Sequence, residues 1–425
     1  MDLYDLVRYY YDQGLVDNLN STTTINVGGA DFTYYSNDSF YNQWTVSGVV
    51  YSTAFISESD LSWDGINAST LSGTVNHIGT VRLPSGGGLG DPIWGITDLS
   101  VNIKELYSVA ITESNLDDKI LIERELSGAD NFYLSDFSDR VWGYSGNDTL
   151  TGNGGSDRLY GGSGNDKLYG GNGNDKSYGE AGNDSLYMDA GNDTLDGGKG
   201  TDWLYVTGRT NSVVNLAKTT GQNTGFGTDI IKNIENASGG SGVDKFYGTG
   251  GNNTLRGNNG NDILQGKNGN DSLYSGNNND SLYGGNNNDK LYGGHGNDRL
   301  QGDAGRDIFD GGNGRDYMYA GNDAGIDVFI FRDISETVNG TQRDRIYQFD
   351  SGEDDIHLRL IDANENLAGD RNFKYSKNGA AANSVWVQDS GSNVLVRGDV
   401  NGDLIHDFEI FVASVDDLYA YDFIL

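Results

Sequence analysis

The chain has 425 residues, of which 62 are acidic and 28 are lysine or arginine, so its formal charge at pH 7 is −34. It contains 64 glycines, two prolines and no cysteine, which excludes collagen, disulfide scaffolds and cysteine-ligated zinc or iron–sulfur sites. The acidic balance argues against nucleic acid as a partner, because phosphates favour a basic surface, and against unaided docking to anionic lipid.

Membrane insertion and a cleavable leader are not indicated by the sequence. No apolar run reaches the roughly 18 residues that a spanning helix needs, so we expect no transmembrane segment. Residues 1–5 (MDLYD) offer no basic region before an apolar stretch, so we expect no cleavable signal peptide. High charge is typical of disorder. However, aromatic residues make up 11% of the chain, so we expect it to fold once a cation offsets the charge.

Residues 1–124 carry both prolines and no clear repeat. Alternating apolar and polar residues between glycine, serine and asparagine turns predict strands over residues 31–35, 44–50 and 74–83. Helices are predicted over residues 3–15, 102–110 and 114–126, the second beginning with a capping box at Asn102 and Glu105. We expect a small β-rich domain with short helices, whose role the sequence does not define.

A nine-residue repeat fills two later tracts. Residues 143–205 hold seven units and residues 239–319 hold nine, with GGSGNDKLY at 161–169 and GGHGNDRLQ at 293–301 as clear examples. Weaker copies before the first tract place Asp130 and Asp139 in the same register. Internal repeats of this length determine the fold before any local pattern does.

Each unit combines a turn with a short strand. Glycines permit positive φ, so the turn can direct its carbonyls toward one point, where the aspartate adds a carboxylate. Six to eight such oxygens at about 2.3–2.6 Å are the ligands that calcium takes. The last three residues form a strand whose middle side chain is a large apolar residue pointing to one side, with Ser177 as the polar exception.

We expect two units to form one turn of a solenoid, so that turns 18 residues apart stack with calcium between them. Asp148 should then lie above Asp166 and Asp184, and Asp262 above Asp280 and Asp298. Asn253 replaces one aspartate, and Asn278 and Asn287 replace glycines, so calcium binding there is expected to be weaker. The predicted metal-binding residues are Asp148, Asp157, Asp166, Asp175, Asp184, Asp193, Asp202, Asp244, Asp262, Asp271, Asp280, Asp289, Asp298, Asp307 and Asp316, with Gly161, Gly164, Gly170, Gly173, Gly293 and Gly296 in the turns.

These units resemble the RTX family of secreted bacterial proteins, whose glycine- and aspartate-rich nonapeptides bind calcium in a parallel β-roll. The resemblance covers roughly residues 125–425. It implies calcium-triggered folding, export through a type I secretion apparatus, and a location outside a Gram-negative cell or on its surface. The expected fold class is therefore predominantly all-β: a parallel β-roll solenoid with calcium between stacked loops, a small β-rich N-terminal domain with short helices, and a β-rich C-terminal cap.

The domain boundaries follow from where the repeat stops. We assign residues 125–205 and 239–319 to two roll blocks and residues 206–238 to a spacer with strand-like runs at 213–216 and 228–236. Residues 320–425 are expected to cap the open apolar end of the roll, with strands at 327–331, 344–349 and 355–358. The first of these alternates as a strand with one exposed face.

The C-terminal segment resembles that of serralysin-type RTX proteins at residues 361–364 (IDAN) and 407–412 (DFEIFV), and residues 422–425 resemble a type I secretion terminus. Asp399, Asn401, Asp403 and Asp407 alternate as calcium ligands would. Because an EF-hand loop needs glycine and glutamate where Leu404 and Ile410 stand, a solvated turn is favoured over a calcium loop.

No catalytic motif accompanies this resemblance. None of the four histidines (His77, His295, His357 and His406) begins a His-Glu-x-x-His motif, and no serine has the glycine spacing of a nucleophile elbow. We therefore expect the chain not to be an enzyme, although the many carboxylates leave open an active site in residues 1–124.

The ninth position of many units is tyrosine and is expected to face outward, in rows about 4.8 Å apart. Such rows suit self-association or carbohydrate binding, but tyrosine also simply suits an exposed strand. The favoured function is a structural or adhesive protein of the cell surface or matrix. The alternatives are a lectin-like module, a lattice or filament subunit, and, less favoured, an ice-binding protein. The expected partners are the secretion apparatus, further copies of the chain and extracellular glycans.

Overall fold

The computed structural model describes residues 127–425, except 135, 137 and 364–371, together with the backbones of seven short strands within residues 1–126. The chain forms two compact units, one of Met1–Ser72 with Leu83–Gly87 and one of Gly73–Arg82 with Gly88–Leu425. No helix among these residues combines the length and the hydropathy that crossing a bilayer requires.

Two antiparallel hairpins form the described part of the first unit. Strand β1 (Thr23–Val27) pairs with β2 (Ala30–Tyr34), which corresponds to the predicted strand at 31–35, and β3 (Ser39–Val46) pairs with β4 (Val49–Ile56). The single strand predicted over 44–50 is wrong, because Trp44 pairs with Tyr51 across a hairpin. The serine–glycine pair at 47–48 is a turn signal that lies inside a continuous alternating pattern.

The remaining predictions for residues 1–126 are only partly tested. Strand β5 (Thr74–Val75) begins where a strand was predicted over 74–83 and pairs with β7 (Val101–Asn102). Asn102, where the helix over 102–110 was predicted to begin, is the last residue of β7. Residues 76–83, 3–15, 103–110 and 114–126, which hold the rest of these predictions, lie outside the described residues.

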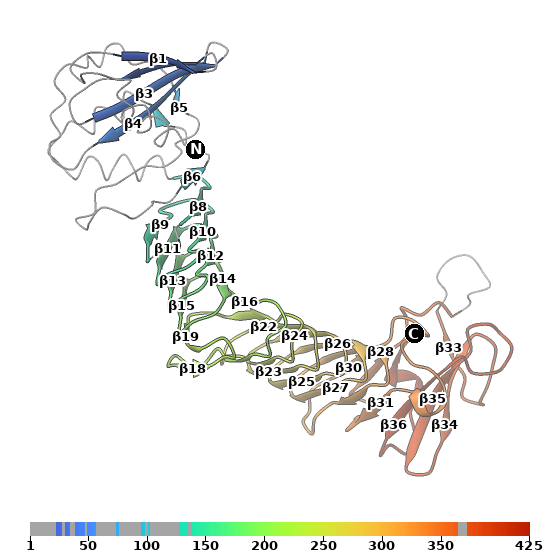
Figure 1. The fold of residues 1–425 in the computed structure, drawn as a ribbon. Coiled ribbons are helices and arrows are strands. Elements are labelled where there is room, and N and C mark those ends of the chain that lie inside the picture. The colour runs from blue at the N-terminus through green and yellow to red at the C-terminus, as the bar shows by residue number, and fades with distance from the viewer. Residues whose placement is uncertain are drawn as a thin grey trace. The chain divides into compact units, whose positions relative to one another are not determined.

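Apart from the pair β5 and β7, the described strands of the second unit stack into three sheets (Figure 1). The longest has fourteen strands in the order β37 (Phe423–Ile424), β32 (Asp355–His357), β30 (Val328–Ile330), β28 (Ile308–Gly314), β26 (Lys290–Gly296), β24 (Ser272–Asn277), β22 (Thr254–Asn259), β20 (Asn236–Ser238), β16 (Trp203–Val206), β14 (Ser185–Met188), β12 (Lys167–Tyr169), β10 (Thr149–Thr151), β8 (Asn131–Tyr133) and β6 (Gly95–Thr97). The six-stranded sheet has the order β18 (Gln222–Asn223), β19 (Thr228–Lys232), β15 (Thr194–Lys199), β13 (Lys176–Ala181), β11 (Arg158–Ser163) and β9 (Arg140–Trp142). The eleven-stranded sheet has the order β17 (Val213–Asn215), β21 (Lys245–Tyr247), β23 (Ile263–Asn268), β25 (Ser281–Asn286), β27 (Arg299–Ala304), β29 (Tyr317–Tyr319), β31 (Arg345–Tyr347), β36 (Phe408–Ala413), β35 (Asn393–Gly398), β34 (Ser384–Asp389) and β33 (Lys374–Tyr375).

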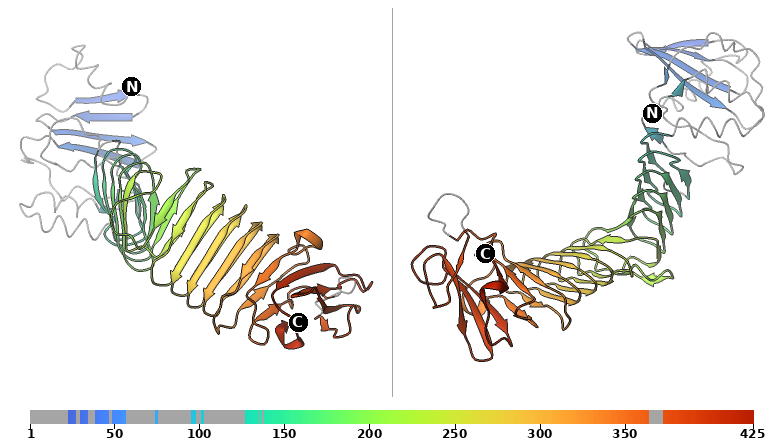
Figure 2. Two further views of the ribbon diagram at one scale, coloured as in Figure 1. Left: turned by 90° about the horizontal axis from the view of Figure 1, so that it is seen from below. Right: turned by 180° about the vertical axis from the view of Figure 1, so that it is seen from behind.

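The register of the repeat strands confirms two units per turn. Neighbouring strands pair in parallel, with partners 18 residues apart, so that Leu150 pairs with Leu168 and Leu168 with Leu186. Consecutive units therefore alternate between two sheets. Figure 2 shows the strands of the second block side by side. The architecture is the predominantly all-β parallel solenoid that the repeat predicted.

The core is a column of apolar side chains between the facing sheets. The middle residues of the repeat strands, such as Leu159 and Leu264, are completely buried, and the residues on either side of each are partly or fully exposed. Burying each leucine stabilises the fold by about 1.5–3 kcal/mol. Ser177 occupies the same column between Leu159 and Leu195 and is also buried.

The spacer residues take part in the sheets. Strand β19 pairs with β15 of the first block, and β20 joins β16 to β22 of the second block. Strand β17 pairs with β21 and so begins the eleven-stranded sheet. The fourteen-stranded sheet therefore runs without interruption from one block to the next.

After the last nonapeptide, the three strands predicted over 327–331, 344–349 and 355–358 are present as β30, β31 and β32, and they continue the two sheets. The prediction that the first has an exposed face is wrong. Val328, Phe329 and Phe331 are all buried, and Ile330 is only partly exposed.

The end of the eleven-stranded sheet is built differently from the roll. Strand β36 pairs in parallel with β31, and the antiparallel strands β35 and β34 follow it. Strand β37 pairs with β32, so residues 423–424 are part of the fold. The two short 3-10 helices of the described residues, Gly340–Gln342 and Ala420–Asp422, also lie in this region.

Candidate calcium centres

The turn of each repeat needs glycine for two separate reasons. Gly164, Gly173 and Gly296 have φ values of +127°, +140° and +142°, in the left-handed region that favours glycine. Gly161, Gly170 and Gly293 do not have positive φ. A Cβ atom on Gly161 would lie 2.3 Å from Oδ2 of Asp166, so this glycine leaves room beside the carboxylate. Conformational freedom, the role predicted for all six glycines, therefore describes only half of them.

The aspartates stack in columns as their spacing predicted. The backbone N–H of Asp148 donates to Oδ1 of Asp166 at 2.8 Å, and that of Asp166 donates to Oδ1 of Asp184 at 2.8 Å. The same bond links Asp262 to Asp280 and Asp280 to Asp298. One carboxylate oxygen of each aspartate thus holds the preceding turn in register.

The second carboxylate oxygen has no partner. In all the predicted ligands except Asp244, Oδ2 is fully buried and accepts no hydrogen bond, and the same is true of Asp130 and Asp344. A buried carboxylate oxygen without a donor is costly. The observation indicates that something other than the protein satisfies these atoms.

The electrostatics of the columns agree with this conclusion. Burial, reinforced by the charge of Asp166, raises the pKa of Asp148 from 3.8 to about 7. Burial also raises the pKa of Asp298 to about 7, and burial together with the Asp344 carboxylate raises that of Asp316 to about 10. Without a bound cation, the ionised form of these aspartates is disfavoured at neutral pH, because like charges lie close together and away from water.

Calcium fits this donor set. The columns offer hard, anionic oxygens, and carbonyl oxygens lie beside them: a Cβ on Gly293 would lie 2.6 Å from Oδ2 of Asp298 and 2.5 Å from the carbonyl oxygen of Gly311. Calcium takes carboxylate and carbonyl oxygens in flexible geometry, whereas zinc favours histidine and cysteine. A bound calcium ion would supply the positive charge that the unpartnered oxygens lack.

The columns change chemistry at the spacer. Asp193 is followed by Asp229, whose Oδ2 accepts a hydrogen bond from the Thr224 hydroxyl, and Asp202 is followed by Glu235. Asn253 directs its amide N–H toward the Glu235 carbonyl oxygen at 2.6 Å. A protein donor thus satisfies Oδ2 of Asp229, and the side chain of Asn253 is itself a donor; the weaker calcium binding predicted at Asn253 stays a prediction.

Asp244 also differs from the other predicted ligands. Its Oδ1 accepts hydrogen bonds from the backbone and the hydroxyl of Ser212, and its Oδ2 accepts one from the N–H of Gly240 at 3.1 Å. Both oxygens of Asp244 are therefore satisfied at the seam between spacer and second block.

Several members of the columns were missed by the sequence analysis. Asp307 is followed by Asp327 and then Asp354, and Asp316 is followed by Asp344. The signal was available, because each of these aspartates stands two residues before a buried apolar residue of β30, β31 or β32. The irregular spacing after residue 319 concealed it.

A second ladder of hydrogen bonds runs beside the aspartates and was not predicted. Oδ1 of Asn165, at the fifth position of its unit, accepts from the N–H of Asn183 at 2.7 Å, and Asn183 accepts likewise from Thr201. The direction is opposite to that of the aspartate ladder. Each turn is therefore tied to the turns on both sides, which explains why asparagine recurs at this position.

The loop at 399–407 was predicted to be a solvated turn rather than a calcium loop, and its residues 402–405 are exposed. Asp399 is buried, and its carboxylate accepts hydrogen bonds from the N–H groups of Asn401, Gly402 and Leu404. These local bonds shape the loop in the way that an Asx turn does.

The ninth-position tyrosines form short stacks of rings. Tyr160 stacks on Tyr178 with centroids 5.0 Å apart, and on Trp142 at 5.3 Å. On the opposite sheet, Tyr187 stacks on both Tyr169 and Tyr205. The rows are interrupted, since Tyr178 is followed by Asp196 in the register.

A family model matches the repeats of this chain. The family model described as the RTX calcium-binding nonapeptide repeat (4 copies) matches in overlapping segments at residues 126–159, 133–168, 151–186, 169–204, 238–273, 256–291, 265–300 and 292–326. Residues 126–204 and 238–326 therefore contain RTX calcium-binding nonapeptide repeats, and their stacked turns bind several calcium ions.

The chain is also similar to a solved structure, the solution structure of the AlgE6R3 subunit from the Azotobacter vinelandii mannuronan C5-epimerase. The sequence identity is 26%, the alignment covers 35% of this chain and 78% of the other, and the TM-score is 0.26. A comparison with curated proteins found no match.

Proposed function

We propose that the chain is a secreted protein that stays open inside a Gram-negative cell, folds when it meets calcium outside, and acts as a structural or adhesive component of the cell surface or matrix. The observation that carries this proposal is the pair of columns of buried, unpartnered aspartate oxygens. Without a counter-charge these columns repel, and the chain keeps the extended form that a secretion channel accepts.

Outside the cell, calcium is present at about 10⁻³ M, and sites in extracellular modules have dissociation constants of about 10⁻⁴–10⁻³ M. Because an open chain has no preformed site, binding energy becomes folding energy. The strands of residues 320–425 supply the first apolar surface on which the roll stacks.

Circular dichroism of the full chain tests this proposal. In EDTA we expect little β signal, and we expect a cooperative gain as calcium is added. Magnesium at equal concentration is the control, since it demands a smaller octahedral site. A chelated protein with the full β signal would contradict calcium-dependent folding.

The structural or adhesive role needs its own test. Electron microscopy of the calcium-loaded protein should show ordered assemblies, and dispersed single particles would argue against a lattice or matrix. The type I secretion apparatus is proposed as the export partner, with residues 422–425 as part of the signal. The prediction that the chain is not an enzyme stays a prediction.

A carbohydrate-binding role is the second candidate, and the stacked rings favour it. Trp142, Tyr160 and Tyr178 form a row on strands β9, β11 and β13, with the Arg140 guanidinium 4.4 Å from the Trp142 ring. Aromatic faces with polar edges suit sugar rings. Glycan binding by the full chain should be lost in a Tyr160→Ala, Tyr178→Ala double variant.

The matched control for that experiment is Tyr283→Ala, because Tyr283 lies between Gln265 and Gln301 in its sheet and so is not part of a tyrosine row. Equal binding by wild type and double variant would leave the rings as packing elements of the sheet.

A further inference from the structure

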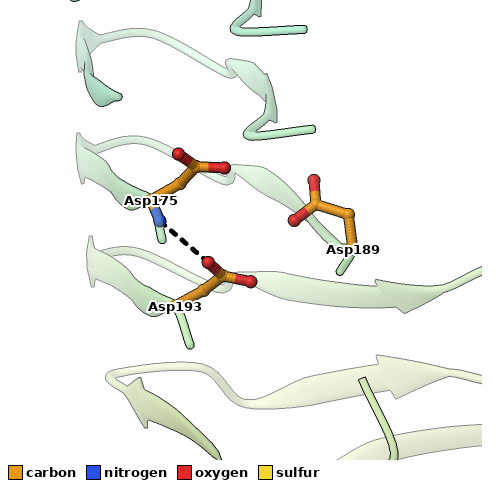
Figure 3. Close-up of side chains that lie close together, drawn as sticks. All are labelled: Asp175, Asp189 and Asp193. Carbon is orange, nitrogen blue, oxygen red and sulfur yellow. Dashed lines mark hydrogen bonds between the residues drawn. The ribbon is translucent and has the colours of Figure 1, made fainter. Parts of the chain in front are cut away.

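One turn of the first block has an additional carboxylate at the second position of its unit, where the unit at 161–169 has glycine. The unit at 188–196 begins with Met188 and Asp189, where the unit at 161–169 begins with two glycines. Asp189, Asp175 and Asp193 bring one carboxylate oxygen each to within 4.8 Å of one another, the only such group of three in the described part of the chain (Figure 3).

The backbone explains why Asp189 turns toward the column. The corresponding second-position residues of the neighbouring units have positive φ, such as Gly171 at +97° and Glu180 at +72°, and Asp189 does not. Glu180 is exposed, whereas Asp189 is partly buried. The changed turn lets Oδ2 of Asp189 accept the N–H of Gly171 at 2.5 Å, one turn back.

The other two members are poised to bind an ion. Asp175 and Asp193 are 2% and 4% exposed, and the N–H of Asp175 donates to Oδ1 of Asp193 at 2.8 Å (Figure 3). The Oδ2 atoms of both are buried and have no hydrogen-bond partner. The two unpartnered oxygens thus lie close to a third carboxylate. Among the described residues, no other pair of stacked aspartates has a third carboxylate this close.

We propose that Asp175, Asp189 and Asp193 form a three-carboxylate calcium site, the tightest of the first block, at which calcium loading of that block begins. Calcium affinity rises with the charge of the ligand set, and this site has one more negative charge than the aspartate pairs above it. The inference rests on calcium binding by the roll and not on export or adhesion.

The test is isothermal titration of the EDTA-stripped full chain with calcium chloride at pH 8, comparing wild type with Asp189→Asn. Asparagine keeps an oxygen for the Gly171 N–H and removes only the charge. We expect one class of sites, that of the three-carboxylate site, to weaken by at least about tenfold, one decade being about 1.4 kcal/mol.

Glu180→Gln is the matched control, because Glu180 holds the same repeat position one unit earlier, loses the same charge and is exposed. It should change the affinity by less than about twofold. Asp189→Glu, which restores the charge, should recover most of the wild-type affinity and keeps the test decisive where Asp189→Asn fails to fold.

The results distinguish calcium binding by the roll from calcium binding at the three-carboxylate site. Wild-type protein that takes up no calcium would contradict calcium binding by the roll altogether. Wild-type uptake with an unchanged Asp189→Asn variant, or with Asp189→Glu as impaired as Asp189→Asn, would overturn only the three-carboxylate site and leave Asp189 as a hydrogen-bond acceptor for Gly171.

Discussion

Replacing Gly161 with alanine places a methyl group beside a calcium-binding carboxylate. A Cβ on Gly161 would lie 2.3 Å from Oδ2 of Asp166 and 2.9 Å from the carbonyl oxygen of Gly179, whereas ordinary contact begins at 3.4 Å. The carboxylate must therefore withdraw by about 1 Å. Its Oδ1 accepts the N–H of Asp148 at 2.8 Å, so withdrawal breaks that bond as well.

A hydrogen bond to a charged group contributes about 1.5–3 kcal/mol. We therefore expect Gly161→Ala to destabilise the calcium-loaded first block by about 1.5–3 kcal/mol and to raise the calcium concentration at its folding midpoint. Because several ions bind in the same transition, the rise should be smaller than the roughly tenfold that about 1.4 kcal/mol gives for a single ion. The assay is calcium titration followed by circular dichroism, with limited proteolysis to locate the weakened block.

Gly250→Ala is the control for this substitution. A Cβ there would meet nothing within 4 Å, and Gly250 does not have positive φ. The stability of Gly250→Ala should stay within roughly ±0.5 kcal/mol of wild type, as for an ordinary surface change, so its calcium midpoint should stay close to that of wild type. A Gly161→Ala protein that matches Gly250→Ala would refute the argument that this glycine keeps room for the carboxylate and its ion.

Three further predictions concern pH, the core and the asparagine ladder. The folded-state pKa values of Asp148 and Asp262 are raised from 3.8 to about 7, so their stabilising contribution to the ion-free roll is complete below pH 4 and lost as pH rises through 7. In calcium-free buffer, circular dichroism of protein stripped of calcium beforehand should therefore show β structure at pH 4 that disappears by pH 8. A β signal that grows with pH would contradict this. Ser177→Leu places an apolar side chain between Leu159 and Leu195 in the buried column. We expect it to stabilise the fold by about 1–2 kcal/mol and to raise the thermal midpoint in calcium. A lower midpoint would show that the column has no room for the larger side chain. Asn165→Ala removes the acceptor for the backbone N–H of Asn183. We expect it to lower the free energy of unfolding by about 1 kcal/mol in the same assay and to leave the number of bound calcium ions unchanged. Fewer bound ions would mean that Asn165 acts on the calcium sites.

The sequence predicted the roll because two different residue types recur with the same nine-residue period. A buried residue every nine positions fixes the strand, and an aspartate two residues before it fixes the turn, so the contacts of Leu168 and Asp166 follow from position alone. The predicted stacking of Asp148, Asp166 and Asp184 is accordingly confirmed by their hydrogen bonds.

What the sequence did not reveal depends on geometry between turns. The closeness of Gly161 to Asp166 and the acceptor role of Asn165 arise only when turns stack. Asp189 was missed because its side chain direction depends on a local φ rather than on residue type. The strand predicted over 44–50 failed because alternation alone does not distinguish one strand from a tight hairpin.

The most direct test of the account is an anomalous difference map from crystals of the full chain grown in calcium. We predict ions between successive aspartates of each column, such as Asp148 and Asp166 or Asp280 and Asp298, and a weaker peak beside Asn253, whose amide N–H donates to the carbonyl oxygen of Glu235. An intact roll whose aspartate oxygens are instead satisfied by water or protons would contradict the account.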